Sequence, residues 1–233
     1  MKKYILLISS IISIWLTSYL SLLPLNGNSQ ADISNLYNTS ITPAWFTFSI
    51  WSIIYLSWII LWFYLIYNKN EIKKKKIILL SAAQLTSMIW LFPWHYNMVG
   101  LSVIIMLWLL WILSLLVIKR NKNKVFQGIS DFFFWWILVA TIVNIHTFLI
   151  YVDIYIYPII LWVISLIIWW IINIIIIHKY KTIIPSIVFI WALFWIISKQ
   201  ADVSIISTSY IIWFIVLSIM LKNIFQNKKT PLL

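Results

Sequence analysis

Residues 99–118 read VGLSVIIMLWLLWILSLLVI, a stretch without a single charged side chain. A helix needs about 20 apolar residues to cross a hydrocarbon core about 30 Å thick, and this stretch reaches that length. A helix also satisfies every backbone N–H and C=O group internally, as lipid requires. The stretch therefore predicts one membrane-spanning helix.

The rest of the chain repeats this pattern. Of its 233 residues, 64% are hydrophobic and 9% are charged, whereas soluble domains are about 45–50% apolar and about 25% charged. A composition this apolar excludes a soluble fold, because too few polar groups remain to cover a surface. Short polar clusters separate apolar runs at 4–23, 44–67, 77–96, 99–118, 131–151, 156–177, 183–197 and 204–221. We therefore predict an all-α polytopic membrane bundle of eight transmembrane helices.

The positive charges predict an orientation. With a cytoplasmic N-terminus, 16 of the 17 Lys and Arg residues fall in inner segments, and Lys199 alone lies outside. This asymmetry follows the positive-inside rule, and we expect a multi-pass protein of the inner (cytoplasmic) membrane with both termini cytoplasmic. The net charge of +12 is then a topology signal, with anionic inner-leaflet lipids as partners of the lysines. Nucleic acid is not expected, because the basic runs are short and lack aromatic side chains.

The first predicted span has a second interpretation. Lys2 and Lys3, an apolar run and the sequence Ser29-Gln30-Ala31 also fit a signal peptide with a cleavage site. The apolar run is about 20 residues long, more than the 7–15 of a typical signal peptide, so we favour a retained helix. Cleavage would leave seven spans.

One face of the second span is aromatic. Phe48, Trp51, Tyr55, Trp58 and Trp62 follow one another at spacings of 3, 4, 3 and 4 residues, which keeps them on one helical stripe. An interfacial aromatic belt explains only the residues at the two ends. The deeper side chains either pack between helices or line a pocket, because flat aromatic faces suit a planar ligand and indole N–H groups can donate to it.

The fifth span repeats the helical spacing with Trp136, Ala140 and Asn144. Polar groups at this depth usually point into the bundle, so Asn144 either ties two helices together or meets a ligand. The small Ala140 leaves room for another helix or for a ligand edge. At the start of this span, we expect Asp131 to serve as a helix N-cap.

The third span carries the other polar and aromatic candidates. We expect Gln84 to hold two helices together, and Pro93 to kink or end the helix because it lacks a backbone N–H. Trp90 and Trp94, which follow Gln84 in the same span, are four residues apart and therefore lie on one face of the helix. His95 fits an interfacial residue hydrogen-bonded to water or backbone better than a metal or haem ligand.

Together these residues resemble the TspO/MBR family, the tryptophan-rich sensory proteins related to the mitochondrial translocator protein. The run Pro43-Ala44-Trp45, followed by Trp51 and Tyr55, is similar to the signature that opens the second helix of that family. Trp136, Ala140-Thr141 and Asn144 look like its fifth-helix pattern, and Trp90 matches in place. The resemblance covers about residues 1–152, a five-helix domain. It leaves 153–233 as three further transmembrane helices with a basic tail.

The resemblance implies a membrane binding or sensory protein with a pocket for a planar apolar ligand, a tetrapyrrole such as porphyrin or haem. No cofactor is required and no metal or catalytic residue is expected. Ser87 stands where the family usually has Asn, and Tyr151-Val152-Asp153 lacks the basic residue of the proposed sterol motif, so sterol binding is not carried over. The candidate ligand-binding residues are Trp45, Trp51, Tyr55, Trp58, Ser87, Trp90, Trp136, Ala140 and Asn144.

Two other classes of function are weaker. An inner-membrane transporter of small molecules is the alternative, although the spans hold no charged residue near the midplane, which ion-coupled carriers usually need. A membrane enzyme is not expected, because three His and five Asp or Glu residues give no convergent catalytic set. The last three helices could form a lid, the surface of a homodimer or a fused helper domain.

Overall fold

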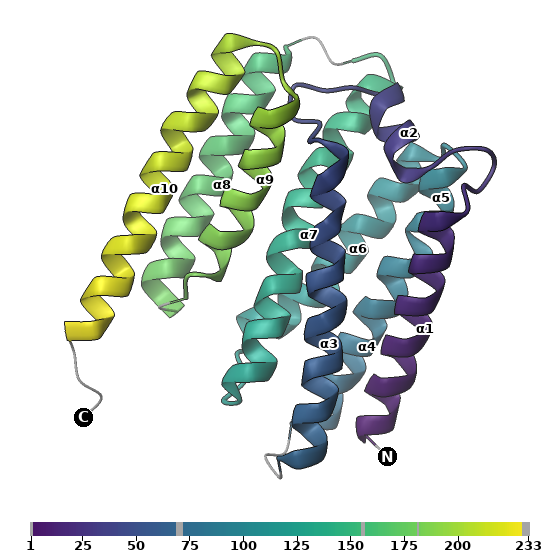
Figure 1. The fold of residues 1–233 in the computed structure, drawn as a ribbon, viewed down its shortest axis with the longest axis vertical. Helices are drawn as coiled ribbons and strands as arrows, with labels where there is room; N and C mark the ends of the chain where they lie inside the picture. The colour runs from purple at the N-terminus through teal and green to yellow at the C-terminus, as the bar shows by residue number, and fades with distance from the viewer. Residues whose placement is uncertain (1, 69–71, 155–156, 181, 230–233) are drawn as a thin grey trace. The chain divides into compact units, whose positions relative to one another are not determined.

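The computed structural model describes residues 2–68, 72–154, 157–180 and 182–229, and every long element in these ranges is a helix (Figure 1). The chain forms two compact units, which we describe separately. Unit 1 contains residues 1–38 and 48–154, and unit 2 contains residues 39–47 and 155–233. We call residues 39–47 the strap, because this segment leaves unit 1 after one helix and returns to it before the next.

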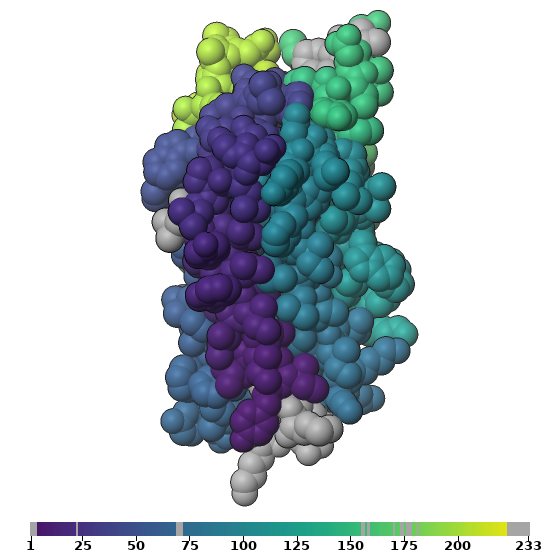
Figure 2. Space-filling model, turned by 90° about the vertical axis from the view of Figure 1, so that its right-hand side faces the viewer, coloured from purple at the N-terminus to yellow at the C-terminus, as the bar shows by residue number. Residues whose placement is uncertain are grey.

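Unit 1 is a bundle of long helices with two short ones. Its helices are α1 (Lys2–Leu22), α2 (Gln30–Leu36), α3 (Ile50–Tyr67), α4 (Lys74–Ile89), α5 (Leu91–His95), α6 (Val99–Ile118) and α7 (Lys124–Tyr151). A 3-10 turn, η1 (Trp45–Ser49), leads from the strap into α3. Helix α7 packs against α6 and α3, and α1 packs against α4 and α3. Figure 2 shows the outer face of α1 in purple beside the blue and teal helices of this unit.

A buried amide joins α1 to α4. Ser9 Oγ donates to Gln84 Oε1 at 2.6 Å, and Gln84 Nε2 donates to Ser10 Oγ at 3.0 Å. The Gln84 side chain has no exposed surface. Lipid provides no hydrophobic drive for two helices to associate, so small and polar side chains such as these fasten them. The prediction that Gln84 ties two helices together is confirmed.

The prediction for Asp131 is wrong. Helix α7 begins at Lys124, and its N-cap is Asn123, whose Oδ1 accepts a hydrogen bond from Phe126 N at 3.0 Å. Asp131 lies inside the helix with 1% of its surface exposed, paired with Arg120 at 2.9 Å. Gln127 Nε2 also donates to Asp131 Oδ1 at 2.7 Å. Apolar composition marks where a helix meets lipid, whereas this helix starts earlier, at a capping asparagine in the polar segment.

The predicted break at Pro93 is confirmed. Helix α4 ends at Ile89, α5 begins at Leu91, and Trp90 lies between them. Because Pro93 has no N–H, the carbonyl of Ile89 loses the partner that an uninterrupted helix would give it. The third predicted span therefore consists of one long helix and one short turn of helix.

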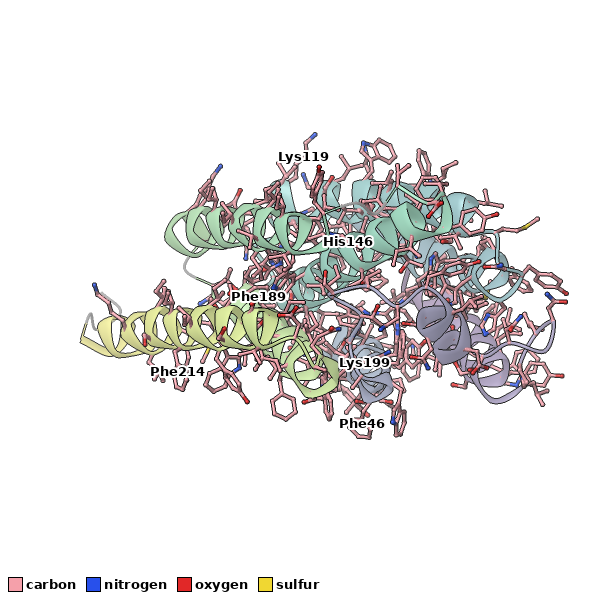
Figure 3. All side chains as sticks on the ribbon, turned by 90° about the horizontal axis from the view of Figure 1, so that it is seen from above. Phe46, Lys119, His146, Phe189, Lys199 and Phe214 are labelled. Carbon is pink, nitrogen blue, oxygen red and sulfur yellow. The ribbon has the colours of Figure 1, made fainter. Side chains whose placement is uncertain are left out.

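Unit 2 consists of the strap and three helices, α8 (Pro158–Tyr180), α9 (Ile184–Lys199) and α10 (Val203–Lys229). Helix α9 packs against both α8 and α10. The rings of Trp169 on α8 and Phe189 on α9 stack with centroids 3.5 Å apart. Phe214 on α10 is 59% exposed and points away from the helices (Figure 3).

The helices make this a polytopic membrane bundle. Within the described ranges, six helical segments are long and apolar enough to cross a membrane, and two shorter apolar segments, Ile159–Trp169 and Ile184–Lys199, lie in α8 and α9. The six correspond to predicted spans one to five and eight. Crossing by α8 and α9 stays a prediction. The start of the sixth predicted span, at Ile156, lies outside the described residues.

Candidate functional site

Five aromatic side chains from α3 and α7 form one cluster inside unit 1, which we call the aromatic cluster. Its members are Trp51, Tyr55 and Trp58 of α3, and Phe133 and Trp136 of α7. Ring centroids lie 6.4 Å apart for Trp51 and Trp136, in an edge-to-face arrangement. They lie 5.8 Å apart for Trp51 and Tyr55 and 5.2 Å for Trp58 and Phe133. Such pairs add roughly 0.5–1.5 kcal/mol each beyond the area that they bury, so the cluster joins the two helices firmly.

The cluster contains buried hydrogen-bond donors without acceptors. Trp58 is 0% and Trp136 4% exposed, and the indole N–H of each finds no partner among the described residues. A buried donor left unsatisfied costs about 1–3 kcal/mol. An acceptor supplied by a bound molecule would remove this cost.

Asn144 lies two helical turns beyond Trp136 and is 2% exposed. Ser102 Oγ of α6 lies 3.0 Å from Asn144 Oδ1 and 2.8 Å from the carbonyl of Val99. A serine has one hydroxyl proton and can donate to only one of these acceptors. If the proton goes to Val99, the Asn144 amide turns over and its N–H₂ donates to Ser102. In either arrangement, one end of the Asn144 amide has no partner among the described residues.

The two predicted residues of the third span have other contacts. Trp90 is 7% exposed and stacks on Trp94 with ring centroids 5.2 Å apart. Trp94 Nε1 in turn donates to the carbonyl of Gln30 on α2 at 3.2 Å. Ser87 Oγ donates to the carbonyl of Gln84 at 2.7 Å, within its own helix. Its hydroxyl proton is therefore already used.

The structure divides the nine predicted residues among several places. It joins Trp51, Tyr55, Trp58 and Trp136 in the aromatic cluster. Ala140 is half-buried on α7 between Trp136 and Asn144. Trp45 is 71% exposed and belongs to the strap, where its ring meets the edge of Phe46 at 5.3 Å.

Sequence reasoning missed two residues of this region. Phe133 stands three positions before Trp136, on the same helical face, and this spacing could have found it. Ser102 is one of two serines in the apolar stretch 99–118, which could have marked it as a partner for a buried amide. Neither Phe133 nor Ser102 belongs to a sequence motif that would have identified it more specifically.

A separate apolar groove of about 690 Å³ lies between α1 and α3. Trp15 and Tyr19 of α1 and Trp62 and Phe63 of α3 are among its lining residues. None of the nine predicted residues lines it. The groove is therefore distinct from the aromatic cluster.

The backbone contact predicted for His95 is confirmed, and its interfacial position stays a prediction. Its side chain is fully buried, and its Nδ1 lies 2.7 Å from the carbonyl of Leu91, one turn earlier. In the part of the chain that the structure describes, no three His, Asp or Glu side chains come together to hold a metal ion. The aromatic cluster itself offers ring faces for stacking and indole N–H groups for hydrogen-bond donation.

Comparison with known proteins identifies the family. No curated protein and no solved structure matches this chain. The TSPO-like protein family matches residues 3–222, so the match continues through α8, α9 and most of α10, beyond the limit of about 152 that the motifs indicated. Tryptophans at helical spacing, a buried amide on α7 and a family match over nearly the whole length lead to one conclusion: the chain belongs to the TSPO-like protein family.

Proposed function

We propose that this protein binds a planar, largely apolar ligand, a tetrapyrrole such as protoporphyrin or haem, at the aromatic cluster. The observation that carries the proposal is the pair of buried indole N–H groups on Trp58 and Trp136, which have no acceptor among the described residues. A tetrapyrrole offers a flat apolar ring to the aromatic faces and carboxylates to N–H donors. Hydrogen bonds to a charged acceptor are roughly twice as strong as those between neutral groups.

Asn144 and Ala140 extend the proposed site along α7. The free end of the Asn144 amide supplies one more polar contact, and Ala140 provides space beside it. The tetrapyrrole is the ligand in this proposal, and no further cofactor is needed. Family membership supports a binding or sensory role, and no specific observation favours transport.

We further infer that both termini lie in the cytoplasm and that the protein resides in the cytoplasmic membrane. Within unit 1, Lys76 Nζ of α4 donates to the carbonyl of Lys119 after α6, so two lysine-rich connections share one end of the bundle. This juxtaposition supports the inner position that the charge count assigns to both. Anionic lipid headgroups of the inner leaflet are the expected partners of these lysines.

Titration of the purified protein with protoporphyrin tests the proposed site. We expect saturable quenching of tryptophan fluorescence, and an affinity about tenfold lower in Trp51→Ala and in Trp136→Ala. Trp108→Ala is the matched control, because Trp108 is 55% exposed on α6 and stacks on Trp111 outside the cluster. The chain has 17 Trp, so the porphyrin absorption band should be followed as a second signal. Equal affinity in all four proteins would contradict the proposal.

A further inference from the structure

The strap is held by α9 and by the residue that follows it. Gln200 Nε2 donates to two carbonyls of the strap, that of Thr39 at 3.2 Å and that of Thr42 at 3.0 Å. One primary amide thus uses both of its protons on one turn of backbone. Ala44 N donates to the carbonyl of Trp195 at 2.9 Å, which adds a bond in the opposite direction.

Two tryptophans of α9 extend this contact. Trp191 Nε1 donates to the carbonyl of Thr47, the last strap residue, at 3.3 Å. The ring of Trp195 lies against Phe46 with centroids 5.0 Å apart. Figure 3 labels Phe46, which belongs to the strap, and Lys199, the last residue of α9. These contacts give a role to C-terminal tryptophans that no sequence motif explained.

The strap also has a fixed shape of its own. Thr39 N donates to Thr42 Oγ1 at 2.7 Å, and Thr42 N donates to the carbonyl of Thr39 at 3.1 Å. Ile41 and Thr42 are each 1% exposed. Residues 39–42 of the strap therefore form a folded, buried turn rather than a loose connection.

The strap leads through η1 into α3, so the contacts of α9 with the strap also constrain the start of α3, which carries Trp51 of the aromatic cluster. Thr47 is followed directly by Phe48, and Trp51 stands one helical turn later, against Trp136 of α7. A hydrogen bond at Thr47 therefore fixes the backbone that leads into the first turn of α3. If that backbone is released, the start of α3 is free to swing and Trp51 to part from Trp136.

We propose that α9 and Gln200 form a clamp on the strap, with Gln200 and Trp191 as positioning residues that control access to the aromatic cluster. The closed clamp holds Trp51 in place, and its opening admits or releases a ligand. The identity of that ligand rests on the proposed function, whereas the control of access does not.

Thiol labelling tests the clamp without any ligand, because the protein contains no cysteine. Ile41→Cys reports opening of the strap, and Ala140→Cys reports access to the proposed site beside Trp136. Ile33→Cys, on α2 and 1% exposed, is the control position for general loosening. Each is combined with Gln200→Met, which keeps the size of the side chain but cannot donate, and separately with Trp191→Phe. Trp213→Phe is the matched control, because the Trp213 indole N–H has no partner among the described residues.

We expect both Gln200→Met and Trp191→Phe to raise the labelling rate of the thiol at position 41 about tenfold, because each variant removes hydrogen bonds whose loss corresponds to roughly a tenfold change. The labelling rate of the thiol at position 140 should rise several-fold. The thiol at position 33 should keep its rate in both clamp variants. All three thiols should keep their rates when they are combined with Trp213→Phe. Unchanged labelling at position 41 or at position 140 in the clamp variants would overturn the clamp.

Porphyrin kinetics separate the clamp from the proposed function. The ligand should associate and dissociate faster in Gln200→Met and Trp191→Phe than in the wild-type protein, with a smaller change in affinity. If the wild-type protein fails to bind porphyrin while the thiols at positions 41 and 140 both respond, the proposed function is wrong and the clamp stands.

Discussion

Asn144 combines two roles that substitutions can separate. Its amide contacts Ser102 across α6 and α7, and its other end is buried without a partner among the described residues. Ser102→Ala removes the interhelical bond and the contact of Ser102 with the Val99 carbonyl but keeps the Asn144 amide, and it should lower the free energy of unfolding by about 0.5–1.5 kcal/mol. Asn144→Leu removes the same bond and also the group offered to a ligand.

We therefore expect Asn144→Leu to weaken porphyrin binding about tenfold and Ser102→Ala to change it less than about threefold. Titration of both variants, together with thermal unfolding in detergent, measures the two effects independently. Equal losses of affinity would mean that Asn144 acts only through the packing of α6 on α7.

The ion pair of Arg120 and Asp131 is unequal in burial, which predicts an unequal response to substitution. Arg120 is 28% exposed, whereas Asp131 is 1% exposed and also accepts a bond from Gln127. Arg120→Leu strands a buried carboxylate and should cost about 2–4 kcal/mol. Asp131→Asn leaves a neutral group that still accepts from Gln127, while Arg120 can turn to water, so it should cost less. Thermal unfolding of the two variants tests this order, and a larger loss in Asp131→Asn would contradict it.

At the scale of an element, helix α2 depends on pH through its capping box. Asp32 Oδ2 accepts from Ser29 N at 2.8 Å, and Ser29 Oγ accepts from Asp32 N at 3.2 Å. The bonds from Ser29 lower the pKa of Asp32 below its usual value. A carboxyl with a lowered folded-state pKa stabilises the helix above its ordinary pKa, and this contribution is lost as pH falls through the lowered value.

We expect the amides of α2 to exchange faster with solvent at acidic pH, after correction for the intrinsic exchange rate. Asp32→Asn should abolish this dependence, because its amide does not titrate. The bond from Trp94 Nε1 to the carbonyl of Gln30 gives a pH-independent anchor for the same helix. A persistent pH dependence in the Asp32→Asn variant would assign it to another group.

Helices could be predicted from the sequence wherever the length of an apolar run alone determined them, whereas the contacts between helices could not. The stretch 99–118 is α6 from end to end, because uninterrupted apolar residues define both of its limits. The start of α7 was missed, because a helix can continue past the lipid boundary when a residue such as Asn123 caps it. Trp51, Tyr55 and Trp58 share a face by period alone. The choice of Phe133 as their partner depends on the rotation of α7, which no single-helix pattern supplies.

Trp45 shows a second limit of the sequence. The motif that contains it predicted a ligand contact, which stays a prediction, but it did not predict that the last residue of the strap is bonded to a tryptophan 144 positions later. No feature of the sequence within residues 39–47 predicts that Trp191 is the partner. Long-range hydrogen bonds of this kind appear only once the whole chain has folded.

At the scale of the whole molecule, the predicted domain boundary at residue 152 lies close to the break between the two units, which follows Ile154. The strap lies between α2 and α3 in sequence but belongs to the unit of α8, α9 and α10. The TSPO-like family match covers both units, to residue 222. The family match therefore includes α8, α9 and most of α10, and the separation of the last three helices as a second domain stays a prediction.

The crossing of α8 and α9 decides the topology of the whole molecule. Helix α8 contains 23 residues and at 1.5 Å per residue extends roughly 35 Å, enough to span. Helix α9 contains 16 residues and extends roughly 24 Å, so a crossing by α9 would need local thinning of the bilayer or Lys199 reaching the interface. Both crossings are needed if α10 is to end in the cytoplasm.

Single cysteines in this cysteine-free chain test the proposed orientation. A membrane-impermeant maleimide should label Ile154→Cys and Ala201→Cys from the outer face, and Lys122→Cys and Lys179→Cys only in inverted vesicles. All four positions are exposed, so labelling depends on the side of the membrane rather than on burial. Outer labelling of the Lys179→Cys variant would show that α8 does not cross. Inner labelling of the Ala201→Cys variant, with position 179 still inside, would show that α9 lies in the membrane without spanning it, which would place the end of α10 outside.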